Sequence, residues 1–209
     1  MVCTAIAGGL ISGVYNYTSQ VMNNRQSGND WQTSLKSIDV KQLAVATAGG
    51  VVAGATMGLL APGFVAVAGI AGTAAAGGVS NLVAGQFEAL LSAGVDQSLD
   101  MQAGEAFDKV EFDQAAADNG FLQGDVMAVD TITGIATAGL TQLGLNQVLG
   151  PQLHPSISMT ASRQALLEAH GFATGLSAGF ARGFSNVVDE IVIRGTREVI
   201  NPYILDKDK

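Results

Sequence analysis

Charged side chains are scarce in this sequence. Asp, Glu, Lys and Arg together make up only 13% of the 209 residues, about half the share of an ordinary soluble domain. Ten Lys and Arg stand against eighteen Asp and Glu, so the net charge is −8. No basic stripe is present that could meet nucleic-acid phosphates. The composition therefore predicts that nucleic acid is not a partner of this protein.

Cysteine and histidine, which carry much of enzyme and metal chemistry, are almost absent. Cys3 is the one cysteine, which excludes an internal disulfide and a cysteine-based zinc site. No zinc-deaminase motif, no HExxH motif and no Glu-x-Glu pair occurs. His154 and His170 are the two histidines. We therefore predict no cofactor and no metal, and we expect a protein that is not an enzyme.

One enzymatic alternative stays open in residues 152–209. A Ser-His-acid arrangement can be drawn from Ser156 or Ser158 with His170 and Glu168, but no GxSxG elbow accompanies it. His154 precedes Pro155 and is expected in a loop.

The charges that are present divide the chain. Three stretches have almost no ionisable side chain: 1–24, 42–87 and 131–162. Between the second and the third lies an acidic block, 88–130, whose only base is Lys109. We interpret the acidic block as a solvated face.

The local pattern is helical nearly throughout, because Ala, Leu, Gln and Met are frequent and strand-like alternation is rare. Asp39 is the expected N-cap of a helix that begins near Val40. Turns are expected at 27–30, Asn119–Gly120 and Gly150–Pro151. We predict an all-α fold, a compact bundle of about seven glycine-rich helices, in two parts: 1–150, and a C-terminal helical region 151–209.

A helical hairpin is predicted in the longest uncharged stretch. A bilayer core about 30 Å thick needs about 20 apolar residues per helix, and residues 42–87 hold two such lengths. Proline and glycine together interrupt a helix, so Pro62 and Gly63 are the expected tip between arms 43–61 and 64–87.

Small residues recur at every fourth position. Glycines at this spacing lie on one helix face, and each costs about 1 kcal/mol in an exposed helix, so another backbone is expected to lie against them. Such stripes are typical of transmembrane helix interfaces. The predicted packing faces are Gly50, Gly54 and Gly58 in the hairpin, and Gly171, Gly175, Gly179 and Gly183 in the C-terminal region.

Three settings for these helices remain open: a sheltered form that inserts into a membrane later, permanent burial in a soluble bundle, and permanent membrane residence. No Trp or Tyr belt flanks the hairpin, and Lys41 is its single basic anchor, which favours later insertion. The N-terminus has no basic region before its apolar residues, so no secretory signal is predicted.

The stretches GGLISGVYNYTSQVMNN, VKQLAVATAGGVVAGATMGLLAPG and AGTAAAGGVSNLVAGQ, with Trp31 in the loop between the first two, are similar to the Gly/Ala-rich segment that follows the repeat core in Rhs-repeat polymorphic toxins. The resemblance covers about residues 3–150. It implies a secreted effector that a shell of YD repeats encapsulates, that an immunity protein neutralises, and that acts in a target cell. The family's self-cleavage signature is absent from this chain.

Together these observations predict a bacterial toxin domain that inserts glycine-striped helices into the lipid bilayer of a target cell and forms an ion-permeable pore, with self-association in the membrane as an open question. Stronger activity is expected at mildly acidic pH, where carboxylates are protonated. The alternatives are a non-catalytic packing or translocation segment of an Rhs-type toxin, and an enzymatic toxin whose site lies in 152–209.

Overall fold

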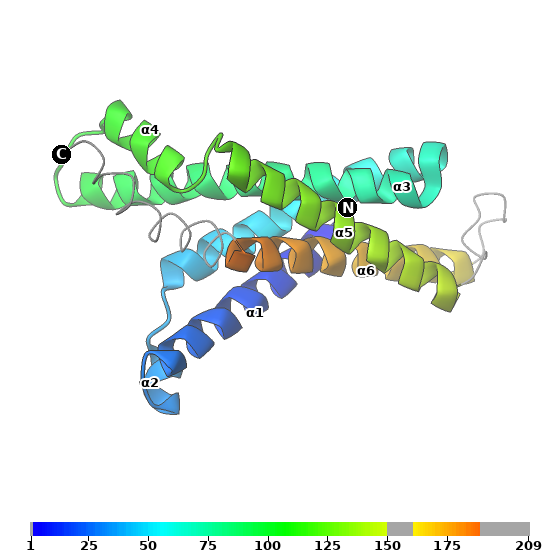
Figure 1. The fold of residues 1–209 in the computed structure, drawn as a ribbon, viewed down its shortest axis with the longest axis horizontal. Coiled ribbons are helices and arrows are strands. Elements are labelled where there is room, and N and C mark those ends of the chain that lie inside the picture. Colours follow the sequence, from blue (N-terminus) through cyan, green and yellow to red (C-terminus); the bar gives the residue numbers. More distant parts are fainter. Residues whose placement is uncertain (1, 150–160, 189–209) are drawn as a thin grey trace, which may run out of the picture.

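The computed structural model describes residues 2–149 and 161–188, and these residues form six helices and no strand (Figure 1). The predicted all-α fold is confirmed. The helices are α1 (Val2–Gln26), α2 (Trp31–Lys36), α3 (Val40–Gln102), α4 (Lys109–Asp118), α5 (Gly124–Leu149) and α6 (Ala161–Val188).

Aspartates fix the starts of three helices. Asp39 accepts a hydrogen bond from the backbone N–H of Gln42 at 3.0 Å, and α3 begins at Val40 as predicted. Asp30 and Asp108 cap α2 and α4 in the same way. The turns predicted at 27–30 and Asn119–Gly120 are confirmed, whereas Gly150–Pro151 and His154 lie outside the described residues.

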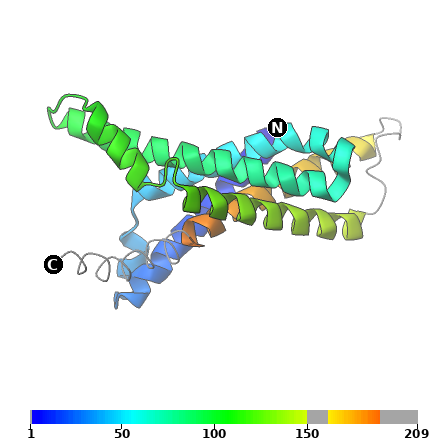
Figure 2. The ribbon, with the colours of Figure 1, turned by 45° about the horizontal axis from the view of Figure 1, so that its top comes forward.

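Helix α3 folds back on itself as a hairpin with two antiparallel arms, residues 40–68 and 70–102 (Figure 2). Lys41 pairs with Asp96 at the open end, and the Ser80 hydroxyl donates to the Ala53 carbonyl nearer the tip. The predicted hairpin is therefore present.

The predicted position of the hairpin tip is wrong. Pro62 and Gly63 lie within helical backbone, and the chain leaves the helix at Gly69, where φ is 56° and ψ is −127°. A reversal needs backbone angles that glycine alone adopts without steric cost. Proline in a helix interior removes a hydrogen bond and clashes with the preceding turn, yet the backbone stays helical on both sides of Pro62.

The predicted glycine stripes lie between helices of this chain. Helix α1 packs between the first arm of α3 and α6. A Cβ added at Gly50 would overlap the carbonyl oxygen of Gly8, and one added at Gly179 would overlap the same atom. Gly54 and Gly175 meet Thr4 in a similar way. Glycine thus lets three backbones come together at one level of the bundle.

The remaining positions of the predicted glycine stripes are Gly58, Gly171 and Gly183. Gly183 lies against the ring of Tyr15 on α1. Gly58 is half-buried in the first arm of α3. Gly171 lies in α6, but its surroundings are outside what the structure describes. A further close glycine contact joins Gly77 of α3 and Gly134 of α5.

The interior of the bundle is small and polar. Apart from Val21 and Met57, every buried apolar side chain in the described part of the chain is an alanine. Buried hydroxyls link helices, as where Ser12 donates to the Ala46 carbonyl at 2.8 Å. The large apolar side chains point outward instead. Those in the four long helices include Val2, Ile6, Leu10, Val14, Val51, Leu59, Val79, Val83, Ile132, Leu140, Phe180 and Phe184.

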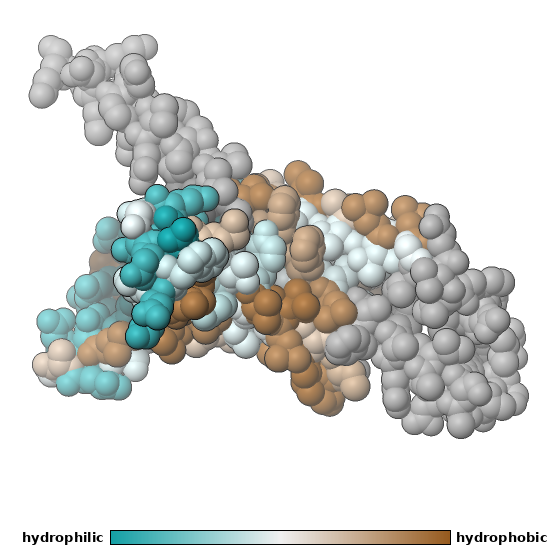
Figure 3. Space-filling model, turned by 90° about the horizontal axis from the view of Figure 1, so that it is seen from below, coloured by the Kyte–Doolittle hydropathy of each residue, from teal (hydrophilic) through white to brown (hydrophobic). Residues whose placement is uncertain are grey.

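The molecule has two ends of different chemistry. We call residues 2–14, 49–87, 131–149 and 174–181 the apolar body, which carries no charged side chain. We call residues 22–39 and 92–126, with α2 and α4, the polar end. Figure 3 shows hydrophilic side chains at the end where α2 and α4 lie in Figure 1, and hydrophobic ones over the middle.

Candidate functional site

Three charged side chains from three helices meet inside the bundle, where the apolar body joins the polar end. Glu88 of α3, Asp130 of α5 and Arg182 of α6 have exposed fractions of 7%, 0% and 4%. We call these three residues the charge cluster. Charged groups at this depth require partners, because burial removes the water that solvates them.

Arg182 binds Glu88 through two parallel hydrogen bonds. Its Nε donates to Glu88 Oε1 at 2.8 Å, and its Nη2 donates to Oε2 at 3.1 Å. The Asn186 amide donates to the same Oε2 at 3.1 Å. Both oxygens of Glu88 are therefore engaged in the fork geometry that suits a guanidinium and an ionised carboxylate.

Asp130 is held on one oxygen only. Its Oδ1 accepts from Arg182 Nη1 and, at 2.6 Å, from the Ser185 hydroxyl. The Asn81 amide donates at 2.7 Å to the backbone carbonyl of Asp130. Asp130 Oδ2 and Asn81 Oδ1 are buried and have no hydrogen-bond partner among the described residues. Within the described helices, two buried acceptors of the residues that meet here therefore lack a donor.

Two glycines make room for the charge cluster. A Cβ added at Gly49 would overlap the carboxyl group of Glu88, and one added at Gly85 would overlap Asp130 Oδ2 and lie 2.8 Å from Arg182 Nη1. The charged side chains thus lie directly on helix backbone. Any larger residue at either position would displace a carboxylate.

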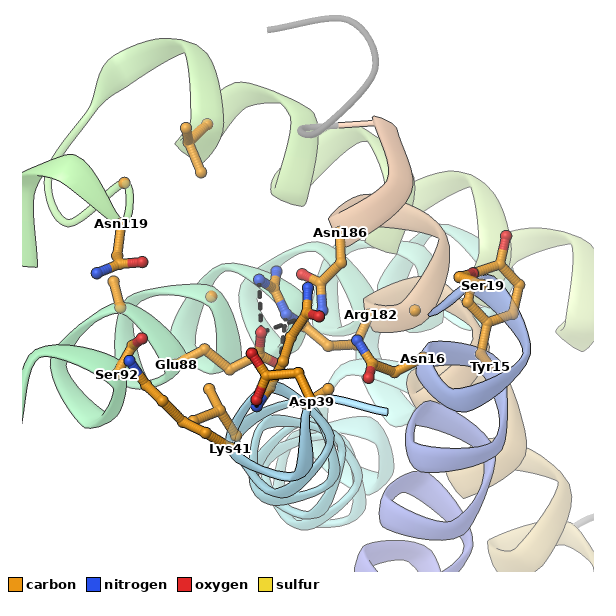
Figure 4. Close-up of a pocket in the computed structure, with 18 of the residues that line it drawn as sticks. Tyr15, Asn16, Ser19, Asp39, Lys41, Glu88, Ser92, Asn119, Arg182 and Asn186 are labelled. Carbon is orange, nitrogen blue, oxygen red and sulfur yellow. Dashed lines mark hydrogen bonds and ion pairs between the residues drawn. The ribbon is translucent and has the colours of Figure 1, made fainter. Parts of the chain in front are cut away.

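A polar pocket of about 330 Å³ leads to the charge cluster from the polar end. Glu88 and Arg182 form part of its lining, and Figure 4 shows them between helices with Asn186, Lys41 and Ser92 nearby. Amide and hydroxyl side chains supply most of the remaining polar lining: Asn16, Ser19, Gln20, Asn23, Gln42, Asn119 and Gln123. The pocket therefore offers a route for water or a small ion to Glu88.

The sequence interpretation did not identify this site. Glu88 and Asp130 are the first and last residues of the acidic block, and the prediction that the block is a solvated face is wrong for both. It holds for Asp113 and Asp118, which are exposed. The missed signal is position: each cluster residue is an isolated charge at the border of an otherwise uncharged helical stretch.

The residues considered for catalysis lie largely outside the described part. Ser156 and Ser158 are not described, and the side chains of Glu168 and His170 in α6 are not described either. Among the described residues, no group of His, Cys, Asp and Glu could hold a metal ion.

No protein family, curated protein or solved structure matches this chain. The similarity to Rhs-repeat toxins therefore remains a prediction. Two described segments are long and apolar enough to cross a membrane, Val40–Ala61 and Gly124–Gly144, and only 33% and 22% of their apolar windows are buried in the bundle.

Proposed function

We propose that this chain is a toxin domain whose apolar body inserts into a lipid bilayer and makes it permeable to small ions. The observation that carries the proposal is the inverted distribution of side chains. Alanine, glycine, serine and threonine fill the interior, while valine, leucine, isoleucine and phenylalanine point outward from α1, α3, α5 and α6. In water the hydrophobic effect favours the opposite arrangement, whereas in lipid helices associate through small and polar residues.

The length of the apolar body suits this environment. From Gly49, which lies against Glu88, to the reversal at Gly69 the first arm of α3 rises about 30 Å. Helix α5 rises a similar distance from Asp130 to Leu149 without another charge. The hydrocarbon core of a bilayer is about 30 Å thick. Helix α6 has a shorter uncharged stretch, between Glu168 and Arg182.

The polar end is suited to remain in water. Large apolar side chains are exposed there too, but charged ones stand among them, including the exposed Lys109–Asp113 pair of α4. Both ends of the hairpin, at Lys41 and Asp96, lie on this side. The proposed topology is therefore one-sided, with the tip at Gly69 entering first.

Permeation is expected to occur between copies of the chain. Within one copy, the backbones of α1, α3 and α6 already touch at Gly8, Gly50 and Gly179, which leaves no space for an ion at that level. The toxin part of the proposal depends on the resemblance of residues 3–150 to Rhs-type toxins.

The test is ion and dye release from anionic liposomes, with two matched variants. Leu140 of α5 and Val110 of α4 are 69% and 74% exposed, so Leu140→Glu and Val110→Glu place the same charge at equally exposed helical positions. An acidic residue within the hydrocarbon costs about 3 kcal/mol, so only Leu140→Glu should abolish release.

Release of ions but not of large dyes by the wild type and by Val110→Glu, and none by Leu140→Glu, would support the proposal. Release should also be greater at pH 5 than at pH 7.5. A wild-type protein that stays in solution and releases nothing at either pH would contradict the proposal and favour a non-catalytic packing segment.

A further inference from the structure

The charge cluster does not balance its own charge. Arg182 contributes one positive charge, and Glu88 and Asp130 would contribute two negative charges if both were ionised. The resulting −1 would lie where all three side chains are at least nine-tenths buried. A buried uncompensated charge is costly in a low-dielectric interior. The cluster is therefore short of one positive charge.

Among the residues that the structure describes, the groups around the charge cluster do not supply that charge. The pocket is lined by Tyr15 of α1, by Asp39 just before α3, by Lys41 of α3 and by Asp118 of α4. Lys41 is already paired with Asp96, and both remaining charged groups are acidic. On α5 the nearest other charge along the helix is Asp125, also an acid.

We infer that the cluster binds one proton, and that this proton resides on Asp130 Oδ2. The hydrogen bonds distinguish the two carboxyl groups. Both oxygens of Glu88 accept bonds from Arg182, as expected for an ionised partner. Asp130 uses only Oδ1, and its Oδ2 has no donor among the described residues. The second unpartnered acceptor, Asn81 Oδ1, belongs to the residue that already bonds the Asp130 backbone.

The space at Asp130 Oδ2 suits a proton rather than a metal cation. The oxygen lies against the backbone of Gly85, where even a methyl group would overlap it. A sodium ion needs several oxygen ligands around it, whereas a protonated carboxyl group needs a single acceptor for its O–H. Asp130 is not part of the polar pocket's lining, but the pocket reaches Gly85, Glu88 and Arg182, which are its neighbours.

The sign of the pH dependence follows from this assignment. The folded bundle holds one proton that an ordinary solvated aspartate would not hold at neutral pH. Since the folded state then binds more protons than the unfolded state, the stability of the bundle falls as pH rises. This inference concerns the folded bundle itself and does not depend on membrane permeation.

The direct test is infrared difference spectroscopy of the full chain in lipid vesicles or detergent, which detects the C=O band of a protonated carboxyl group. At neutral pH we expect this band in the wild type and its loss in Asp130→Asn. We also expect its loss in Glu88→Gln, because Arg182 then needs only an ionised Asp130 to balance its charge. The exposed Asp113→Asn is the matched control and should retain the band.

The Glu88→Gln variant keeps the test decisive if Asp130→Asn fails to fold. Loss of the band as pH is raised, together with loss of helical circular dichroism, would support the assignment. A wild type without the band, or a band that persists in Asp130→Asn, would overturn it. Stability that depends on sodium concentration, with no acid band, would also overturn it and would indicate a bound metal cation.

Discussion

The polar end and the apolar body of this protein are built by different means. In the polar end, side chains define the helices. Asp30 caps α2, where the backbone N–H of Thr33 holds the pKa of that carboxyl below its usual value. Arg25 lies 4.8 Å from the centre of the Trp31 ring. In the apolar body, backbone contacts at glycine hold the helices together, and the large side chains face outward.

This difference matches the proposed insertion, in which the polar end stays in water and the apolar body enters lipid. Helix caps and exposed ion pairs suit an aqueous environment, because water satisfies the backbone groups that the caps leave without a hydrogen-bond partner. Direct backbone packing and a small polar interior are effective where lipid removes the hydrophobic driving force between helices. The charge cluster lies at the boundary, and it is the one place in the described helices where two carboxyl groups and a guanidinium cross-link three helices. Variants matched between the two regions test this comparison.

The largest effect is expected at Arg182. Arg182→Met leaves two buried carboxyl groups without their positively charged partner, which costs about 3–5 kcal/mol, and α6 should separate from α3 and α5. Lys109→Met removes a cation from an exposed pair in α4, worth about 0–1 kcal/mol. Denaturation followed by circular dichroism measures both free energies of unfolding.

A second comparison separates lost charge from lost volume. The neutral variant Arg182→Met with Glu88→Gln and Asp130→Asn should recover much of the stability, since no charge then remains buried. If the triple variant is as unstable as Arg182→Met, packing by the arginine side chain and not charge balance accounts for its role.

The next effect is expected at the glycine contacts. Gly175→Leu forces a side chain into the backbone of Thr4, and overpacking of this kind costs about 1–3 kcal/mol or more. The helices should persist while α1 and α6 separate. Gly144→Leu is the control, because Gly144 is an exposed position in α5 with nothing within 4 Å of an added Cβ.

Cross-linking between cysteines placed on α1 and α6 measures the separation, after the native Cys3 is replaced. Equal cross-linking in Gly175→Leu and Gly144→Leu would show that the glycine face is not needed for assembly.

Local signals in the sequence were enough to predict the helices. An aspartate before an apolar run gave the start of α3 at Val40, and the uncharged length of 42–87 gave the hairpin. Both signals come from residues that are close together in the sequence. The tip at Gly69 was not predictable in the same way, because Pro62 and Gly63 carry the stronger local signal and the observed reversal depends on where the two arms align.

The charge cluster depends on arrangement, which the sequence does not give. Glu88, Asp130 and Arg182 come from three helices, and whether they meet depends on the direction and register of each. A solvated acidic block was the simpler interpretation, and it holds for the acids of α4. What the sequence did contain was the isolation of each charge at the border of an apolar stretch, which in a membrane-spanning helix indicates a paired or functional group.

The smallest effect is expected at the cap of α4. Asp108 accepts hydrogen bonds from the backbone N–H groups of Val110 and Glu111, and loss of such a cap costs about 1 kcal/mol. Asp108→Ala should therefore loosen α4 without affecting the apolar body. Hydrogen exchange measures this as faster exchange of α4 amides and unchanged exchange of α1 and α6. Equal acceleration in both regions would show that the polar end and the apolar body unfold as one unit. The two regions would then differ in composition but not in how they are stabilised.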